Sequence, residues 1–111
     1  MQMATEQLEG DVFKIAFDGR FDIAGADAVD LKMNVIAGTK KYLLVDMQKV
    51  SFLGSMGLRT IVTVARTIKS RGGKMVVYGP DEEVEKVLTM SGVTALVPIH
   101  HDLQSALASL H

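Results

Sequence analysis

The sequence predicts an α/β fold in which a mixed β-sheet carries about four helices, mainly on one face. The chain opens with two strand-like segments and then alternates between short apolar strands and helices. Such alternation implies parallel strands joined by right-handed crossovers, and the opening pair adds an antiparallel edge. With 111 residues, 48% of them hydrophobic, the chain is long enough for one core, so residues 1–111 are predicted to form one domain. Four helices of this length cannot cover two faces evenly.

The first strands are predicted from a period of two. Residues 12–17 place Phe13, Ile15 and Phe17 on one side, as in a strand with unequal faces. Residues 7–9 are predicted as a shorter strand that pairs with it across a turn at Gly10.

Gly19 is predicted to end this strand, and a helix is expected after Asp22. Its inner stripe is predicted as Ala26, Val29, Met33 and Ile36, widened by Ala28, Leu31 and Val35. Gly38 is expected to end this helix.

The middle of the chain predicts a buried strand, a polar bend and a helix that opens near Ser55. Residues 42–45 are continuously apolar, as in a strand covered on both faces. Helical spacing predicts an inner face formed by Leu58, Ile61, Val62, Ala65 and Ile68, and Gly72-Gly73 stops the helix.

The last third predicts two further strands and helices. Residues 75–78 and 96–99 are the predicted strands. A helix follows Pro80, with acidic residues in its first turn, and another starts at Asp102. The last helix is expected to turn Leu103, Ala106, Leu107 and Leu110 inward.

Composition excludes several classes of protein. A net charge of −1 gives no support to nucleic-acid binding, and the absence of cysteine rules out disulfides and thiolate chemistry. No leader-like segment and no apolar run of about 20 residues occurs, so we expect a cytoplasmic protein that does not insert into a membrane.

Ser55 is the leading candidate for a functional residue. A helix N-terminus offers unpaired N–H groups and the positive end of the macrodipole, so a serine there is well placed to carry a phosphate. Gly54 and Gly57 keep its surroundings open. The alternative is that Ser55 is simply the helix N-cap.

The segment Val45-Asp46, followed by Val50-Ser51-Phe52-Leu53-Gly54-Ser55-Met56-Gly57-Leu58, resembles the signature of the STAS domain. This is the fold of bacterial anti-sigma factor antagonists. The turn at Gly19-Arg20-Phe21-Asp22, the Gly72-Gly73-Lys74 loop and the tail from Val84 to Leu110 are also similar to the family, so the resemblance covers nearly the whole chain.

The resemblance implies a partner-switching function. Unphosphorylated Ser55 would leave the chain free to bind an anti-sigma factor that is also a serine kinase. Phosphorylated Ser55 would release that partner, and a metal-dependent serine phosphatase would reset the switch. The resemblance places Asp22 in the partner-binding surface. The partner-switching hypothesis adds Gly54, Met56 and Gly57 beside Ser55, and Arg59 for its positive charge one turn away.

Two residues depart from the family pattern. Gly54 stands where an acidic residue usually precedes the phosphoacceptor, and Met56 stands where a small residue usually follows it. These departures keep open an alternative, a constitutive STAS module that is never phosphorylated and serves as a scaffold or transporter-complex subunit. An exposed Met56 patch could also support a homodimer.

Other polar residues have simpler interpretations. Asp22 could cap a helix as well as bind a partner. Asp46, predicted at a strand end, lacks the acidic pair of a receiver-domain phosphorylation site. His100, His101 and His111 are expected in solvated segments and not in a metal site.

The remaining motifs predict no catalysis. Arg59, Arg66, Lys69 and Arg71 form either a solvated face or a rim that meets an acidic partner, and Arg59 lies one helical turn from Ser55. The chain lacks the GxxxxGK[ST] and GxSxG motifs. We therefore predict a binding protein and not an enzyme, with no cofactor.

Overall fold

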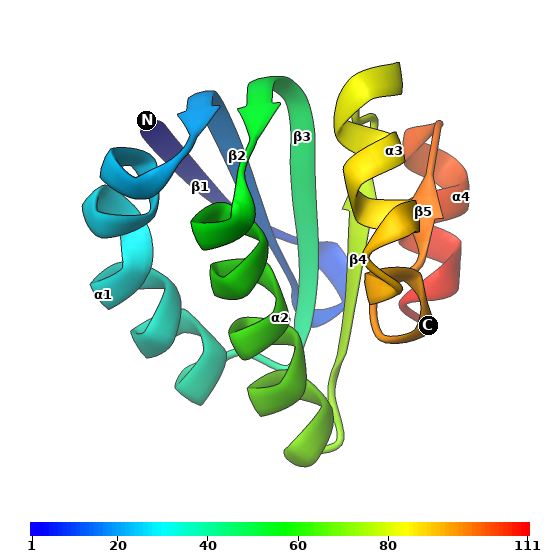
Figure 1. The fold of residues 1–111 in the computed structure, drawn as a ribbon. Helices are drawn as coiled ribbons and strands as arrows, with labels where there is room; N and C mark the ends of the chain where they lie inside the picture. Colours follow the sequence, from blue (N-terminus) through cyan, green and yellow to red (C-terminus); the bar gives the residue numbers. More distant parts are fainter.

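The computed structural model describes residues 1–111 as a mixed five-stranded sheet between two unequal helical layers (Figure 1). The strands lie in the order β1-β2-β3-β4-β5, with β1 antiparallel to β2 and all other neighbours parallel. The strands are β1 (Gln2–Leu8), β2 (Val12–Phe21), β3 (Tyr42–Leu53), β4 (Lys74–Tyr78) and β5 (Ile99–His100). The helices are α1 (Ile23–Thr39), α2 (Ser55–Ser70), α3 (Glu82–Met90) and α4 (Leu103–Ser109), with short 3-10 turns at Glu9–Asp11 and Val93–Ala95.

Two hydrophobic clusters hold the layers together. The larger contains 22 buried residues and lies between the sheet and helices α1, α2 and α3. The smaller contains five buried residues, Val12, Leu44, Val76, Ala106 and Leu110, and lies where α4 covers the opposite face. The predicted α/β class, mixed sheet and helices mainly on one face are confirmed.

Three strands are longer than the sequence pattern predicted. β1 begins at Gln2, and β2 continues through Gly19 to Phe21. β3 runs on to Leu53 through the segment predicted as a polar bend. Beyond Asp46, β3 pairs with β2 alone and not with β4, because β4 ends at Tyr78. This part of the sheet has fewer covered side chains, which explains its polar composition.

Two predictions about α1 are wrong. The helix continues through Gly38 to Thr39 and ends without a left-handed glycine. Instead, the Arg71 guanidinium donates 2.9 Å hydrogen bonds to the carbonyl oxygens of Ala37 and Lys40. Ala28, Leu31 and Val35 do not widen the inner stripe, since all three are exposed.

The later elements follow the predictions more closely. Pro80 leads into α3, and Asp81 and Asp102 cap α3 and α4. The predicted strand at residues 96–99 is shorter and shifted to Ile99–His100, and Leu103 is 40% exposed instead of facing inward.

Candidate functional site

The candidate site lies at the carboxyl edge of the sheet, where β2 and β3 end side by side. Phe21 and Leu53 are paired in register as the last residues of these two strands. Asp22 and Gly54 follow immediately and are the N-caps of α1 and α2. The backbone N–H of Gly54 donates a 3.0 Å hydrogen bond to the carbonyl oxygen of Phe21, which joins the two strand-to-helix turns. Two helix N-termini therefore open next to each other.

Glycine allows α2 to start this close to β2. A Cβ on Gly57 would clash with the Phe21 carbonyl oxygen and with the Phe21 ring. Gly25 plays the same part in α1, where a Cβ would clash with the carbonyl oxygen of Arg20. Gly57 thus acts as a packing residue, and its backbone helps to fix where Ser55 stands.

Ser55 is the first residue of α2 and is exposed. The prediction that it might be the N-cap is wrong, because Gly54 occupies that position. The first backbone bond of the helix runs from Leu58 N–H to the Gly54 carbonyl, so the preceding N–H groups of the turn make no helical bond. No side-chain hydrogen bond within the chain uses the Ser55 hydroxyl. Its oxygen is thus open to a reactant.

Asp22 is the helix cap that the sequence suggested, and it is also part of this edge. Its Oδ1 accepts a 2.9 Å hydrogen bond from Gly25 N–H, and its Oδ2 lies 3.4 Å from Arg20 Nε. The Gly25 N–H bond, helped by Arg20, lowers the pKa of Asp22 below its ordinary value. Asp22 is therefore a carboxylate at neutral pH, next to the turn that carries Ser55.

Exposed apolar side chains surround this edge. Ile23 is 67% exposed and Phe52 is 40% exposed, although both are large hydrophobic residues. The Arg20 guanidinium lies 4.3 Å from the centre of the Phe52 ring, in a cation–π contact. Met56 is half-buried and packs against the main core, so it does not form the exposed patch that the sequence suggested. Apolar side chains around a polar centre are typical of a surface that binds another protein.

Gly54 leaves little room for a side chain at this edge. A Cβ at this position would lie 3.0 Å from a Phe52 ring carbon and 3.7 Å from the Phe21 carbonyl oxygen. An acidic residue here would require the Phe52 ring to move. The opposing turn supplies the carboxylate of Asp22.

Arg59 lies one turn along α2, in a polar groove between α1 and α2. This groove, about 310 Å³ in volume, is lined by Asp30, Asn34, Met56, Arg59, Thr60 and Thr63. At its base Thr60 Oγ1 donates to Asp30 Oδ1 at 2.5 Å and lies 3.2 Å from the Met56 carbonyl oxygen. The structure thus brings Asp22, Gly54, Ser55, Met56 and Gly57 together, with Arg59 in the adjoining groove.

Sequence reasoning missed Arg20, Ile23, Phe52 and the Asp30–Thr60 pair. The β2–β3 register shifts twice between Ala16 and Arg20, so residue spacing does not show that Arg20 meets Phe52. The available signal was one residue before each predicted strand-to-helix turn, the basic Arg20 before Asp22 and the aromatic Phe52 before Gly54.

The remaining candidates lie elsewhere. Asp46 is inside β3 and not at a strand end, as the sequence suggested. Its carboxylate accepts hydrogen bonds from Gln48 N–H and Gln48 Nε2, at 2.9 and 3.1 Å, and Lys14 Nζ lies 3.8 Å away. It is an internally paired residue of the sheet face opposite α1 and α2.

The three histidines have separate surroundings. His100 is half-buried in β5, with its Nε2 buried and unpaired, and not in the solvated segment that the sequence predicted. His101 Nε2 lies 2.7 Å from Glu85, and the His111 ring packs edge-on against Tyr42. No group of three His, Cys, Asp or Glu residues gathers in a geometry that could hold a metal ion. None of the helices has the length and hydropathy needed to cross a membrane.

The sequence of the chain is similar to that of known proteins. The family model of the STAS domain matches residues 2–106. The anti-sigma F factor antagonist of Paenibacillus polymyxa is 26% identical over 112 residues, which cover 99% of this chain and 95% of that protein.

Two solved structures share the fold. The Bacillus cell fate determinant SpoIIAA in the phosphorylated form superimposes with a TM-score of 0.76 at 16% identity, covering 99% of this chain and all of that one. A sulfate transporter family protein from Wolinella succinogenes superimposes with a TM-score of 0.75 at 20% identity, covering 95% of this chain and 88% of that chain.

Proposed function

The chain belongs to the STAS domain family, and from this premise we propose that it is an anti-sigma factor antagonist controlled by phosphorylation of Ser55. The observation that carries the proposal is the exposed Ser55 hydroxyl, unpaired at the first position of α2 inside an apolar rim. The relative from Paenibacillus polymyxa supports the general role. The protein acts by binding, in the cytoplasm, and the chemistry belongs to its partners.

In the unphosphorylated state, the edge around Ser55 binds an anti-sigma factor that is also a serine kinase. Ile23 and Phe52 supply apolar contact, while Asp22 supplies a fixed negative charge. The helix groove with Arg59 lies at the border of this surface. Charged groups at such a border influence the association rate and partner choice more than the affinity.

Phosphorylation transfers the γ-phosphoryl group of ATP to Ser55 Oγ. The P–O bond to ADP breaks, a P–O bond to Oγ forms, and the hydroxyl proton leaves to a base of the kinase. The product carries a charge of about −1.5 to −2. An interface formed by neutral Ser55 must then desolvate this charge close to the Asp22 carboxylate, so the partner is released. A serine phosphatase restores the hydroxyl.

The proposal predicts opposite effects of two substitutions at Ser55. Ser55→Ala should keep binding to the anti-sigma factor of the host, because the apolar rim is intact. Ser55→Asp should weaken binding at least about tenfold, which corresponds to about 1.4 kcal/mol. Titration calorimetry measures both, and Thr94→Asp is the matched control because Thr94 is exposed and lies outside the edge.

A second candidate function is a constitutive STAS module in a transport complex. The likeness to the Wolinella succinogenes protein favours this candidate at the level of the fold. This candidate predicts that Ser55→Ala and Ser55→Asp both leave the binding of the chain to its partner unchanged. Loss of binding only in Ser55→Asp therefore excludes it.

A further inference from the structure

Helix α1 carries a second apolar stripe that points away from the core. Its buried residues are Gly25, Ala26, Val29, Met33 and Ala37. The opposite side of the helix presents Ala24, Ala28, Leu31, Val35 and Gly38, all of which are exposed. Leu31 is 78% exposed and Val35 is 60% exposed. We call these five residues the α1 seam.

The spacing of the α1 seam is that of a coiled coil. The intervals from Ala24 to Gly38 are four, three, four and three residues, which is the a/d pattern of a heptad repeat. In this pattern Leu31 occupies a d position and Val35 an a position. Valine at a with leucine at d favours a parallel two-stranded pairing.

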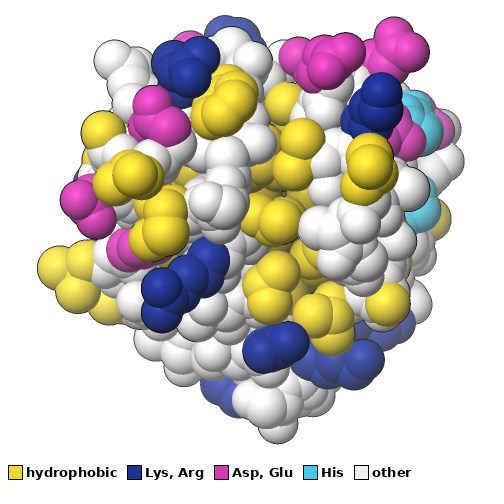
Figure 2. Space-filling model, in the orientation of Figure 1, with side chains coloured by type: hydrophobic (Ala, Val, Ile, Leu, Met, Phe, Trp, Pro, Cys, Tyr) yellow, Lys and Arg dark blue, Asp and Glu magenta, His cyan; other side chains and the backbone are white.

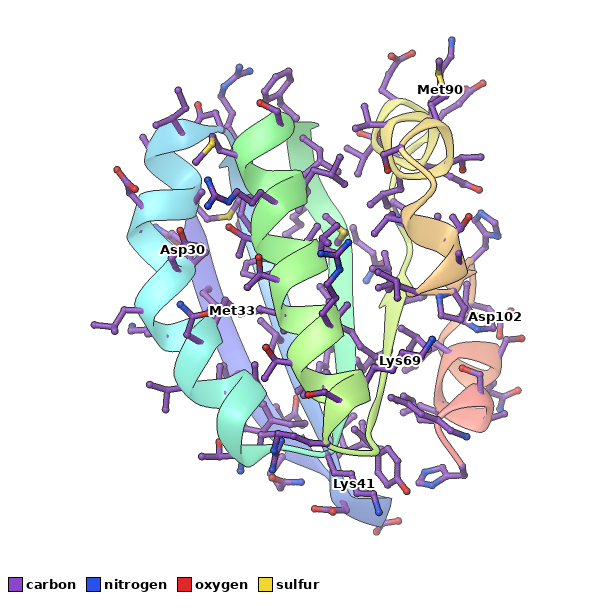
Figure 3. All side chains as sticks on the ribbon, turned by 60° about the horizontal axis from the view of Figure 1, so that its bottom comes forward. Asp30, Met33, Lys41, Lys69, Met90 and Asp102 are labelled. Atoms are coloured by element: carbon purple, nitrogen blue, oxygen red, sulfur yellow. The ribbon has the colours of Figure 1, made fainter.

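The surface around the α1 seam is unusually apolar for a solvent face. Figure 2 shows hydrophobic side chains gathered over α1, interrupted by single acidic groups. On one side the seam continues into a shallow groove of about 530 Å³ between α1 and strands β1 and β2, lined by Met3, Phe13, Leu31, Val35 and Ile36 with Thr5 and Lys32. On the other side Asp30 faces α2 through its bond to Thr60 (Figure 3).

The charged residues beside the α1 seam indicate that its binding partner is a second copy of the chain. Asp27 and Lys32 are both exposed and flank the seam on opposite sides, in the g and e positions. In a parallel pair of helices, a g residue meets the e residue five positions later in the partner helix. Asp27 of each copy would then face Lys32 of the other, twice per pair. An antiparallel pair keeps Asp27 and Lys32 on different sides of the seam, where they cannot meet.

We propose that the chain forms a parallel homodimer through α1, with the α1 seam of one copy packed against that of a second copy. Ala28 lies against Ala28, Leu31 against Leu31 and Val35 against Val35, and two Asp27–Lys32 ion pairs close the sides. The seam runs about 21 Å from Ala24 to Gly38 and offers only two large side chains, Leu31 and Val35, so the interface is small and the dimer is reversible. The twofold axis runs along α1, so both carboxyl edges lie at the same end of the dimer.

Sedimentation equilibrium over a range of about 5 to 500 µM tests the homodimer. Wild-type protein should approach twice the monomer mass of 12.0 kDa as concentration rises. Leu31→Glu should raise the dissociation constant at least about tenfold. Met90→Glu is the matched control, since Met90 is also 78% exposed but lies at the far end of α3 (Figure 3). A monomeric wild-type protein, or equal association of Leu31→Glu and wild type, overturns the proposal.

Charge exchange tests the parallel orientation. Asp27→Lys and Lys32→Asp should each weaken the dimer, by about threefold, because each places like charges across the seam. The double variant Asp27→Lys/Lys32→Asp should return to within about twofold of the wild type. Within one helix these residues are five apart and are not neighbours, so recovery reports contact between copies. A double variant as weak as the singles contradicts the parallel pairing.

A disulfide gives an independent readout of the register. The chain has no cysteine, so Ala28→Cys introduces one thiol at an a position of the α1 seam. Parallel pairing places this thiol opposite itself, and mild oxidation should yield a covalent dimer. Ala108→Cys, on the exposed side of α4, should remain largely monomeric. Equal cross-linking of both variants contradicts the predicted register.

Discussion

At the scale of single residues, the candidate site depends on glycines, which have no side chain, as much as on its polar residues. Gly57 and Gly25 let two helices begin against the end of β2, and Gly54 caps α2 without supplying a side chain. Ser55 therefore stands in the open instead of bonding to its own helix. Asp22, by contrast, is held in place by Gly25 N–H and Arg20.

The pKa of Asp22 predicts a pH-dependent contribution to stability. Because the folded-state pKa lies below its ordinary value of 3.8, Asp22 stabilises the fold above pH 3.8, and this contribution is lost as the pH falls through the folded-state pKa. Asp22→Asn can still cap α1 but does not titrate. Wild type should melt above Asp22→Asn at pH 7, and the difference should shrink in acid.

Thermal melts followed by circular dichroism between pH 7 and pH 2.5 check this prediction at about half-unit steps. Comparing the two variants cancels the contribution of Asp102, whose pKa is lowered by Ser105. A difference in Tm that stays constant down to the lowest pH would show that the charge of Asp22 adds nothing to the cap.

At the scale of elements, the helices were easier to predict than the strands. The start of α2 at Ser55, the helix after Pro80 and the helix near Asp102 followed from local chemistry. Asp81 was expected inside the first turn of α3 and is instead its N-cap. The extent of β3 did not, because its second half pairs with β2 alone and carries polar residues where a buried strand was expected to end. Local periodicity contains no information on where a neighbouring strand stops.

The outer stripe of α1 shows a second limit of the sequence. Ala28, Leu31 and Val35 are apolar at helical spacing, so they were predicted to face the core, yet they are exposed. Periodicity detects an apolar stripe but not whether the sheet or another molecule covers it. The placement of the candidate residues was easier, since Asp22 and the segment Gly54 to Gly57 follow two paired strand ends and lie at one edge. Their role in binding a partner stays a prediction. Arg20 and Phe52 were missed because two register shifts separate them from any simple pattern.

The C-terminus of α1 depends on an element far along the chain. Arg71 bonds to two carbonyl oxygens of the last turn, where a glycine cap was expected. Arg71→Ala should lower the free energy of unfolding by about 1 kcal/mol, because two charge-assisted hydrogen bonds are lost at an exposed site. Urea denaturation measures this, with Arg66→Ala as the control on the exposed face of α2. Equal stability of the two variants would contradict a capping role.

At the scale of the whole molecule, the two faces of the sheet differ in how helices cover them. Three helices cover one face, and the first turns of two of them, α1 and α2, build the candidate site at the carboxyl edge. The short helix α4 alone covers part of the other face, through Ala106 and Leu110. This small cluster packs α4 against the sheet, and Asp46 on the same face is nearly buried and paired with Gln48 and Lys14.

Leu110 is the residue that tests this closure. It is fully buried, and Leu110→Ala should cost about 2–4 kcal/mol of unfolding free energy through lost burial and a new cavity. Leu103→Ala, on the same helix but 40% exposed, should cost less than about 1 kcal/mol. Urea denaturation of both variants decides the point, and similar losses would show that α4 is not anchored by its C-terminal end.

The central claim is that Ser55 is a phosphorylated switch residue, and the most direct test is the mass of the protein from its native host. Intact-mass analysis, with tandem mass spectrometry to locate any modification, should find a single phosphate on Ser55 in part of the population. The same result should follow from incubation with ATP and the serine kinases of the host. A chain that stays unmodified after that incubation, or that carries its phosphate on another residue, contradicts the claim.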